Sequence, residues 1–431
     1  MKSYKTWIFV TFGLVIVVVG LLLGGILSFY SAGYSVEGSS GIVIMLMLSL
    51  VLVGLLTAIV LVSLLMKDQK RRGKDQAHAF PALERIDEEM KKNPPLPYDK
   101  VSLEEFCNEF RKFAAGELGL YYSIDDIRRF VAGLAVSHIL ILQGMSGTGK
   151  TSLAYAFGKF IERDSTIIPI QPMWKERTDL LGYYNEFSKR FNETQFLETI
   201  YQANWRNDMF ITILDELNIA RVEYYFAEFL SLMEIPSSSR YLEIISSTSV
   251  HDPVKMKNGQ IKLPDNIWFI GTANNDDSTF AISDKVYDRA MVLNLDHKAE
   301  AFTVDTWKHV RMNAYDFEKM AREAMAEYRL RYKYKNKLER LDLYMQDTFR
   351  LSFGNRINRQ IEEYTSLYVA CGGDELEALD DILSKKVFRK LVGGNSLYLK
   401  RKSGELLDKL DELFGQNKMF LCKEIILRLV R

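Results

Sequence analysis

The chain has 431 residues, with 56 lysines and arginines against 56 aspartates and glutamates, so its formal net charge is zero. This balance gives no global case for nucleic-acid binding, which is typical of chains with a basic excess. The three cysteines are odd in number and widely spaced, which argues against a disulfide framework and a cysteine metal cluster and suits a reducing compartment.

Two apolar segments near the start, residues 7–30 and 42–66, contain no charged residue. Each is long enough to cross a bilayer core of about 30 Å as a helix. Lysines and arginines flank the pair on both outer sides, whereas the connection, residues 31–41, carries only Glu37. The positive-inside rule then places both chain ends in the cytoplasm. We therefore expect residues 1–66 to form a two-pass hairpin in the lipid of the cell membrane.

A cleaved signal peptide is the alternative interpretation of the first segment. Its apolar run is longer than is usual for such peptides, and it lacks an A-x-A-like cleavage site. The hairpin is the interpretation that we carry forward.

The polar residues 67–100 include Pro94, Pro95 and Pro97, which predicts a cytoplasmic tether with a short helix over residues 82–92. We expect the globular part to begin near Val101. Residues 101–115 have apolar side chains near helical spacing, and Ser123 with Asp126 is a variant of the capping box that opens a helix.

A glycine-rich segment then completes the pattern G-x-x-x-x-G-K-[ST], between an apolar run and a helix-compatible stretch. Its glycines let backbone N–H groups turn toward phosphates. Lys150 is expected to reach the terminal phosphates of a nucleotide, and the Thr151 hydroxyl to ligate Mg²⁺. A structural glycine-rich turn is the alternative. The residues predicted to bind nucleotide are Gly144, Met145, Ser146, Gly147, Thr148, Gly149, Lys150 and Thr151.

Residues 210–216 form an apolar, β-prone run that ends in Asp215 and Glu216. This pattern is typical of a buried parallel strand with carboxylates at its carboxyl end. Together with the phosphate loop, it predicts that Asp215 helps to hold Mg²⁺ and that Glu216 polarises the attacking water.

These residues resemble the AAA+ ATPases, and within them the branch of McrB, MoxR and dynein-related proteins. Residues 215–221, D-E-L-N-I-A-R, are similar to the D-E-I-N-R-A signature of that branch, and residues 226–234 to its F-x-E-L-L-x-L-[ML]-E helix. The resemblance extends over residues 123–393 and is closest to McrB-like ATPases. Near position 274 the chain departs from the McrB pattern M-N-x-x-D-R, because Ala273 replaces Met and Ser278 replaces Arg.

The resemblance implies roles for three later residues. Asn274 follows a predicted fourth strand at the sensor-1 position, where an amide contacts the γ-phosphate or orients water. Arg289 precedes the last strand, where the family carries an arginine finger, and Arg356 falls on the sensor-2 segment of a helical lid, as a phosphate contact. Surface salt bridges are the alternative roles of the two arginines.

The resemblance also implies a ring of identical subunits, most simply six, because an arginine finger acts on the neighbouring subunit's nucleotide. Residues 240–262 contain Asn258-Gly259, a hairpin-turn signal, and resemble the family's pre-sensor hairpin. Residues 329–337 interleave basic and aromatic side chains. They could contact nucleic acid, anionic lipid or a partner, but a solvated face of the lid is the preferred interpretation.

The expected fold is α/β: an AAA+ P-loop NTPase with a parallel sheet between helices and a C-terminal helical lid, preceded by two transmembrane helices. The expected divisions are the membrane hairpin at residues 1–66, the tether at 67–100, the nucleotide-binding domain at 101–300, and the lid with the C-terminal helices at 301–431.

The expected activity is hydrolysis of ATP, with GTP as the alternative nucleotide, in the presence of Mg²⁺. One hypothesis is a membrane-anchored motor that drives a partner encoded elsewhere, such as a nuclease subunit of McrBC-type restriction and phage defence. A MoxR-like chaperone working with a von Willebrand A-type partner is the second, and a nucleotide-gated membrane scaffold is the third. Nucleic acid is expected to be contacted only indirectly, if at all.

Overall fold

The computed structural model describes residues 79–92, 97–246, 252–274, 279–296, 298–393 and 396–430, together with scattered helical residues between positions 51 and 66. The chain divides into two compact units, Met1–His78 and Ala79–Arg431. The first predicted membrane segment, residues 7–30, lies outside the described residues, as does most of the second, residues 42–66. None of the described residues belongs to a helix that is both long and apolar enough to span a bilayer.

A five-stranded parallel sheet forms the centre of the second unit, with the strand order β10-β1-β9-β5-β2. Its apolar strands are almost entirely buried, as expected for a parallel sheet covered on both faces. The strands are β1 (Ile139–Gly144), β2 (Thr166–Pro169), β5 (Phe210–Asp215), β9 (Ile267–Asn274) and β10 (Met291–Asn294). The predicted parallel α/β sheet is confirmed.

Alternate residues of each strand face two separate cores, because side chains of a strand point to opposite faces in turn. In β1, Leu140 and Leu142 join one core, and Ile139 and Ile141 join the other. The first core is covered by α4 (Leu103–Leu118), α5 (Ile124–Val136), α6 (Lys150–Phe160) and α12 (Ala314–Glu327). The second is covered by α7 (Arg177–Leu181), α8 (Gln195–Ala203), α9 (Val222–Tyr225) and α10 (Ala227–Leu232).

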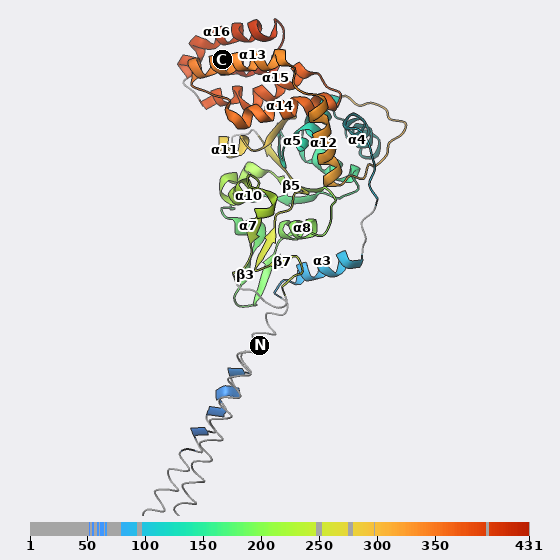
Figure 1. The fold of residues 1–431 in the computed structure, drawn as a ribbon, viewed down its shortest axis with the longest axis vertical. Coiled ribbons are helices and arrows are strands. Elements are labelled where there is room, and N and C mark those ends of the chain that lie inside the picture. The colour runs from blue at the N-terminus through green and yellow to red at the C-terminus, as the bar shows by residue number, and fades with distance from the viewer. Residues whose placement is uncertain are drawn as a thin grey trace, which may run out of the picture. The chain divides into compact units, whose positions relative to one another are not determined.

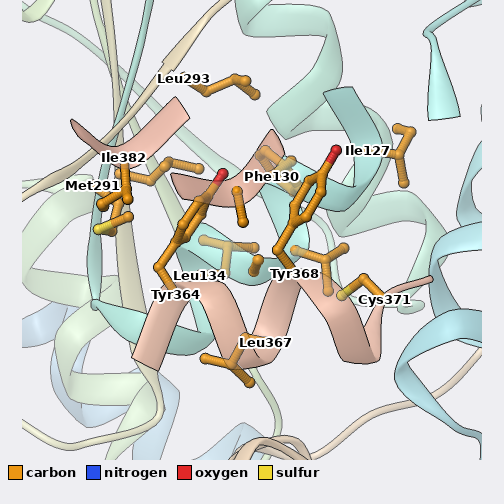
Figure 2. Close-up of a cluster of buried hydrophobic side chains, with 14 of the residues drawn as sticks. Ile127, Phe130, Leu134, Met291, Leu293, Tyr364, Leu367, Tyr368, Cys371 and Ile382 are labelled. Atoms are coloured by element: carbon orange, nitrogen blue, oxygen red, sulfur yellow. The ribbon is translucent and has the colours of Figure 1, made fainter. Parts of the chain in front are cut away.

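The C-terminal helices form the predicted helical region and gather at one end of the unit, coloured orange to red in Figure 1. They are α13 (Tyr332–Phe349), α14 (Gly354–Ala370), α15 (Glu375–Lys386), α16 (Ser396–Phe414) and α17 (Phe420–Val430). Tyr364 and Tyr368 point from α14 toward Phe130 and its neighbours on α5 (Figure 2). The Tyr364 hydroxyl donates a hydrogen bond of 2.7 Å to buried Asp381, which also accepts one of 2.6 Å from Lys385.

Two small antiparallel sheets interrupt the helices of the second core. The β3–β4 hairpin joins Gly182–Asn185 to Arg190–Glu193, and the other sheet has the order β6-β8-β7, formed by Tyr241–Glu243, Gln260–Lys262 and Met256–Lys257. Asn258 and Gly259 connect β7 to β8 with φ values of 53° and 73°, as a two-residue hairpin turn requires. The predicted turn is therefore confirmed.

The segment expected to be a tether differs from that expectation between residues 79 and 92. Helix α3 (Pro81–Lys92) packs on the second core: Phe80 stacks on Phe191 with ring centroids 5.1 Å apart. Buried Asp87 accepts hydrogen bonds from the Tyr201 hydroxyl at 2.5 Å, the Trp205 indole at 3.0 Å and the Val254 amide at 2.8 Å. The short helix expected at residues 82–92 is therefore present and belongs to the compact unit Ala79–Arg431.

The basic and aromatic segment at residues 329–337 runs into α13, and several of its basic side chains form ion pairs or ring contacts within the same unit. Arg331 pairs with Glu375, and Lys335 lies 2.7 Å from Glu362. The ring of buried Tyr334 has the Lys333 ammonium 4.7 Å from its centroid. These contacts favour the interpretation as a face of the lid.

Candidate functional site

The glycine-rich loop follows β1 directly and ends at the first residue of α6. Gly147 and Gly149 have φ values of 81° and 88°, a region in which only glycine is free of strain. Gly144 is constrained differently, because a Cβ at this position would lie 2.5 Å from the Leu295 carbonyl oxygen. The loop therefore needs these glycines both for its backbone turns and for its contact with the segment after β10.

Lys150 is buried beneath this loop, with 7% of its surface exposed. Its ammonium donates hydrogen bonds to the carbonyl oxygens of Gly144 at 3.1 Å and Met145 at 2.7 Å. The Tyr122 hydroxyl donates to the Gly149 carbonyl at 3.0 Å, and the Thr148 hydroxyl to that of Met145 at 3.0 Å. The cation is thus held inside a loop whose curvature is fixed by its own hydrogen bonds.

Asp215, at the carboxyl end of β5, lies against the start of α6. Its Oδ1 accepts hydrogen bonds from the hydroxyls of Thr151 at 2.7 Å and Thr272 at 2.9 Å. The Thr272 hydroxyl in turn accepts the Glu216 amide at 2.8 Å. Thr151, Asp215, Thr272 and Glu216 are therefore joined by consecutive hydrogen bonds.

Glu216 itself has φ 53°, ψ 47°, a left-handed conformation that is uncommon for a residue with a side chain. Such strain persists only where the surroundings enforce it, and it is concentrated at functional sites. Here the hydrogen bond from its amide to Thr272 holds the strained residue at the sheet edge.

Asn274 ends β9 and is paired in register with Gly144, so it lies beside the beginning of the phosphate loop. Asn218 holds its backbone: the Asn218 amide nitrogen donates to the carbonyls of Asn274 at 2.9 Å and Phe280 at 3.2 Å. The Asn274 amide donates to Asn218 Oδ1 at 3.3 Å. The next four residues, 275–278, which include the departure at Ser278, lie outside the described residues.

The residues present at this edge fit Mg²⁺ and a triphosphate. The hydroxyl of Thr151 and the carboxylate of Asp215 offer oxygen ligands 2.7 Å apart, the type that Mg²⁺ prefers beside phosphate oxygens. No cluster of three or more His, Cys, Asp or Glu side chains able to hold a metal occurs within the described part of the chain.

Sequence reasoning missed Thr272 and gave Asn218 no role. Thr272 lies two residues before Asn274 in a predicted strand, but only the folded sheet shows that its hydroxyl meets Asp215. Asn218 belongs to the motif that carries the resemblance, so its position in D-E-L-N was the available signal.

Arg289 and Arg356, the two arginines predicted to contact phosphate, both contact the carboxylate of Glu234. Arg289 Nε is 2.7 Å from Glu234 Oε1, and Arg289 Nη2 donates to Oε2 at 3.1 Å. Arg356 Nη2 donates to the same Oε1 at 2.5 Å. A cavity of about 550 Å³ adjoins all three residues and is also lined by Arg359 and by His138.

This arginine cluster is separated from the phosphate loop of the same chain. The cavity is lined by Ser137, His138 and Ile139 at the amino end of β1, whereas the phosphate loop begins at Gly144 at its carboxyl end. The six residues of β1 place the two ends about 17 Å apart, at about 3.3 Å per residue. The structure therefore places Arg356 beside Arg289 and not beside the phosphate loop of its own chain.

Comparison with known proteins identifies part of the chain. Residues 139–290 match the family described as AAA domain (dynein-related subfamily). No curated protein matches the chain.

Among solved structures, the chain is similar to a putative ATPase from Cytophaga hutchinsonii, with 14% sequence identity and a TM-score of 0.42 over 84% of this chain and 98% of that chain. It is also similar to a full-length MCM homolog from Methanopyrus kandleri, with 12% identity and a TM-score of 0.37 over 67% of this chain and 61% of that chain. The family match spans the phosphate loop, Asp215, Glu216, Asn274 and Arg289, so these residues lie in the part of the chain that is similar to an AAA domain of the dynein-related subfamily.

Proposed function

We propose that this chain hydrolyses ATP, or GTP, between neighbouring copies of itself in a ring, most simply a hexamer. The observation that carries the proposal is the hydrogen-bonded series Thr151, Asp215, Thr272 and Glu216 beside the phosphate loop. This series brings three residues to one edge of the sheet. The Thr151 hydroxyl and the Asp215 carboxylate are suited to hold Mg²⁺, and Glu216 carries a second carboxylate.

In this proposal the loop from Gly144 to Thr151 binds the triphosphate through backbone N–H groups and Lys150. Thr151 and Asp215 would hold Mg²⁺, which supplies neutralising charge for the transferring phosphoryl group. Glu216 orients and polarises the attacking water, and Asn274 contributes an amide beside it.

The arginines act in this proposal on the nucleotide of a neighbouring copy. Arg289 and Arg356 lie at the amino end of β1, about one strand length from the loop, so they are remote from the nucleotide of their own chain. Their side chains are 25% and 41% exposed, which leaves them accessible to a neighbour. A head-to-tail arrangement repeats the same contact at every interface and closes into a ring.

Two single substitutions test the activity. Glu216→Gln and Arg289→Ala should each keep nucleotide binding and lose hydrolysis, the second by about a thousandfold or more, as is found for arginine fingers. Equilibrium binding of nucleotide and steady-state phosphate release measure the two properties separately. Full turnover by Arg289→Ala would remove the role of the neighbouring copy.

The membrane anchor is a proposal supported by the sequence: two uncharged segments at residues 7–30 and 42–66, with basic residues on both outer sides. It places the ATPase domain and both termini on the cytoplasmic side of the cell membrane. Extraction of the full chain into the soluble fraction by high salt or alkaline carbonate, without detergent, would contradict it.

The work that hydrolysis drives is proposed from the McrB-like motifs: the ring acts on a partner protein, such as a nuclease subunit in phage defence. A MoxR-like role in assembling complexes with a von Willebrand A-type partner is the alternative, and a nucleotide-gated scaffold is a third. Mass spectrometry of proteins that co-purify in mild detergent separates them. A nuclease favours the first and a von Willebrand A domain the second, whereas an assembled ring without hydrolysis favours the scaffold.

A further inference from the structure

Glu234 bridges two parts of the chain that are far apart in sequence. It follows α10, while Arg289 lies directly before β10 and Arg356 lies on lid helix α14. Both oxygens of its carboxylate are used: Oε1 is 2.7 Å from Arg289 Nε and 2.5 Å from Arg356 Nη2, and Oε2 accepts from Arg289 Nη2 at 3.1 Å.

The position of Glu234 offsets the repulsion between the two guanidinium groups. Two guanidinium groups that share one oxygen atom repel each other, and they stay together only if a carboxylate lies between them. Glu234 is the only acid among the described residues that line the adjoining cavity. Arg359 has its own partner outside the lining, Glu363 at 3.8 Å, so the excess is that of Arg289 and Arg356 over Glu234. The cluster therefore keeps a positive excess next to an open cavity, which is a suitable place for a further anion to bind.

The orientation of Arg289 is also fixed from a second direction. Its Nη1 donates a hydrogen bond of 2.7 Å to the Lys285 carbonyl, on α11 (Asp284–Tyr287). Glu234 and Lys285 thus hold the guanidinium on two sides, while part of the side chain is exposed to solvent. A flexible side chain would have to lose this freedom when a neighbour's phosphate arrived, whereas a guanidinium held in advance does not.

We propose that Glu234 is a positioning residue for hydrolysis: it holds Arg289 and Arg356 side by side so that both meet the phosphates of the neighbouring copy's nucleotide. The inference rests on the proposed function, because it assumes that these arginines act across the interface. Glu234 itself touches no nucleotide in this arrangement. It belongs functionally to the arginine side of the interface and not to the phosphate-loop side.

The direct test is Glu234→Gln in the full chain, which keeps the size of the side chain and removes its charge. We expect kcat to fall by about 100-fold, the cost of misplacing a catalytic group by about 1 Å. Nucleotide binding should stay at its wild-type value, because the phosphate loop lies at the other end of β1. Glu234→Asp keeps the charge and should recover part of the lost rate.

A matched control lies on α10. Glu228 forms a pair of hydrogen bonds with Arg177, both 2.9 Å long, at a similar exposure of 29% against 33% for Glu234. Glu228→Gln breaks an arginine pair of the same kind away from the cluster and should leave kcat unchanged. An equal loss in both variants would mean that a broken surface ion pair is enough to slow turnover, and it would overturn the inference.

Mixing variants separates positioning from a merely structural role. Glu234→Gln copies have an intact phosphate loop, so added Glu216→Gln copies, whose arginines are intact, should restore turnover. Added Arg289→Ala copies should restore none, because both variants are defective on the same side of the interface. Recovery with Arg289→Ala, or a wild-type kcat for Glu234→Gln, overturns the inference. If Arg289→Ala alone turns over normally, the proposed function has failed instead.

Discussion

The two ends of strand β1 differ in how their charged groups are satisfied. At the carboxyl end, Lys150 and Asp215 are held by hydrogen bonds within the same few segments. At the amino end, Arg289 and Arg356 come from distant segments and share one acid beside a cavity of about 550 Å³. In the proposed function, the first end binds the nucleotide of its own chain, and the second acts on the nucleotide of a neighbouring copy. Because the phosphate loop and the arginine cluster lie at opposite ends of β1, the arginines of one copy could not act on the nucleotide bound by the same copy.

Removing Lys150, at the carboxyl end of β1, should have the strongest effect. Lys150→Ala removes the cation beneath the phosphate loop, and nucleotide affinity should fall by about 100-fold or more, because charge-assisted contacts to phosphate are lost. Arg289→Ala, at the amino end, should leave affinity unchanged. Isothermal titration with a non-hydrolysable nucleotide measures both. Equal losses of affinity would mean that the two ends are not functionally distinct.

The Thr272 hydroxyl, at the same end, should have the next strongest effect. Thr272→Val removes the hydroxyl between Asp215 and the Glu216 amide, so kcat should fall by about 10- to 100-fold, as for residues that orient metal ligands. Thr212→Val is the matched control, since Thr212 is buried in neighbouring β5 and its hydroxyl has no hydrogen-bond partner among the described residues. Turnover measured with saturating nucleotide should drop in the first variant only.

A third prediction concerns a region that belongs to neither end. Asp87→Ala leaves three donors without their acceptor, so the free energy of unfolding should fall by about 3 kcal/mol. Turnover per folded molecule should not change, because the three donors belong to Tyr201, Trp205 and Val254, none of which is part of either cluster. Glu88→Ala, at an exposed position of the same helix, should be neutral. A loss of kcat in the folded fraction of Asp87→Ala would contradict this separation.

The smallest effect is a pH dependence at the amino end. Lys386 donates hydrogen bonds to the carbonyls of Tyr287 at 2.7 Å and Ala290 at 2.6 Å, on either side of Arg289, and burial lowers its pKa to about 7. Asp288 opposes this lowering, while Arg389, Lys390 and Arg356 add to it. Between this pKa and the usual value of 10.5, the unfolded chain binds one more proton than the folded chain, so stability rises with pH.

The slope from this one group is at most about 1.4 kcal/mol per pH unit. Chemical denaturation at pH 7.0 and about pH 7.7, below the pKa of about 8.5 at which thiols of the unfolded chain titrate, measures it. Lys386→Met should lack this part of the slope. An identical slope in the two proteins would contradict the depressed pKa.

Local patterns predicted the phosphate loop, the acids after β5 and the parallel strands, because each depends on residues adjacent in sequence. The contacts of Thr272, Asn218 and Glu234 escaped prediction, since each joins segments tens of residues apart. Helix α3 was assigned to a tether for the same reason: Asp87 and its partner Tyr201 are 114 positions apart. The resemblance placed Arg356 on the lid, but not at the end of the sheet where the fold puts it.

The most direct test of the central claim mixes two inactive proteins. Glu216→Gln copies keep their arginines and Arg289→Ala copies keep their water-activating carboxylate, so an active site can form only where the two meet. In an equal mixture, turnover should return to roughly a quarter of the wild-type rate, the share of correctly matched interfaces in a randomly assembled head-to-tail ring. No recovery, from copies shown to assemble together, would contradict a site shared between neighbours.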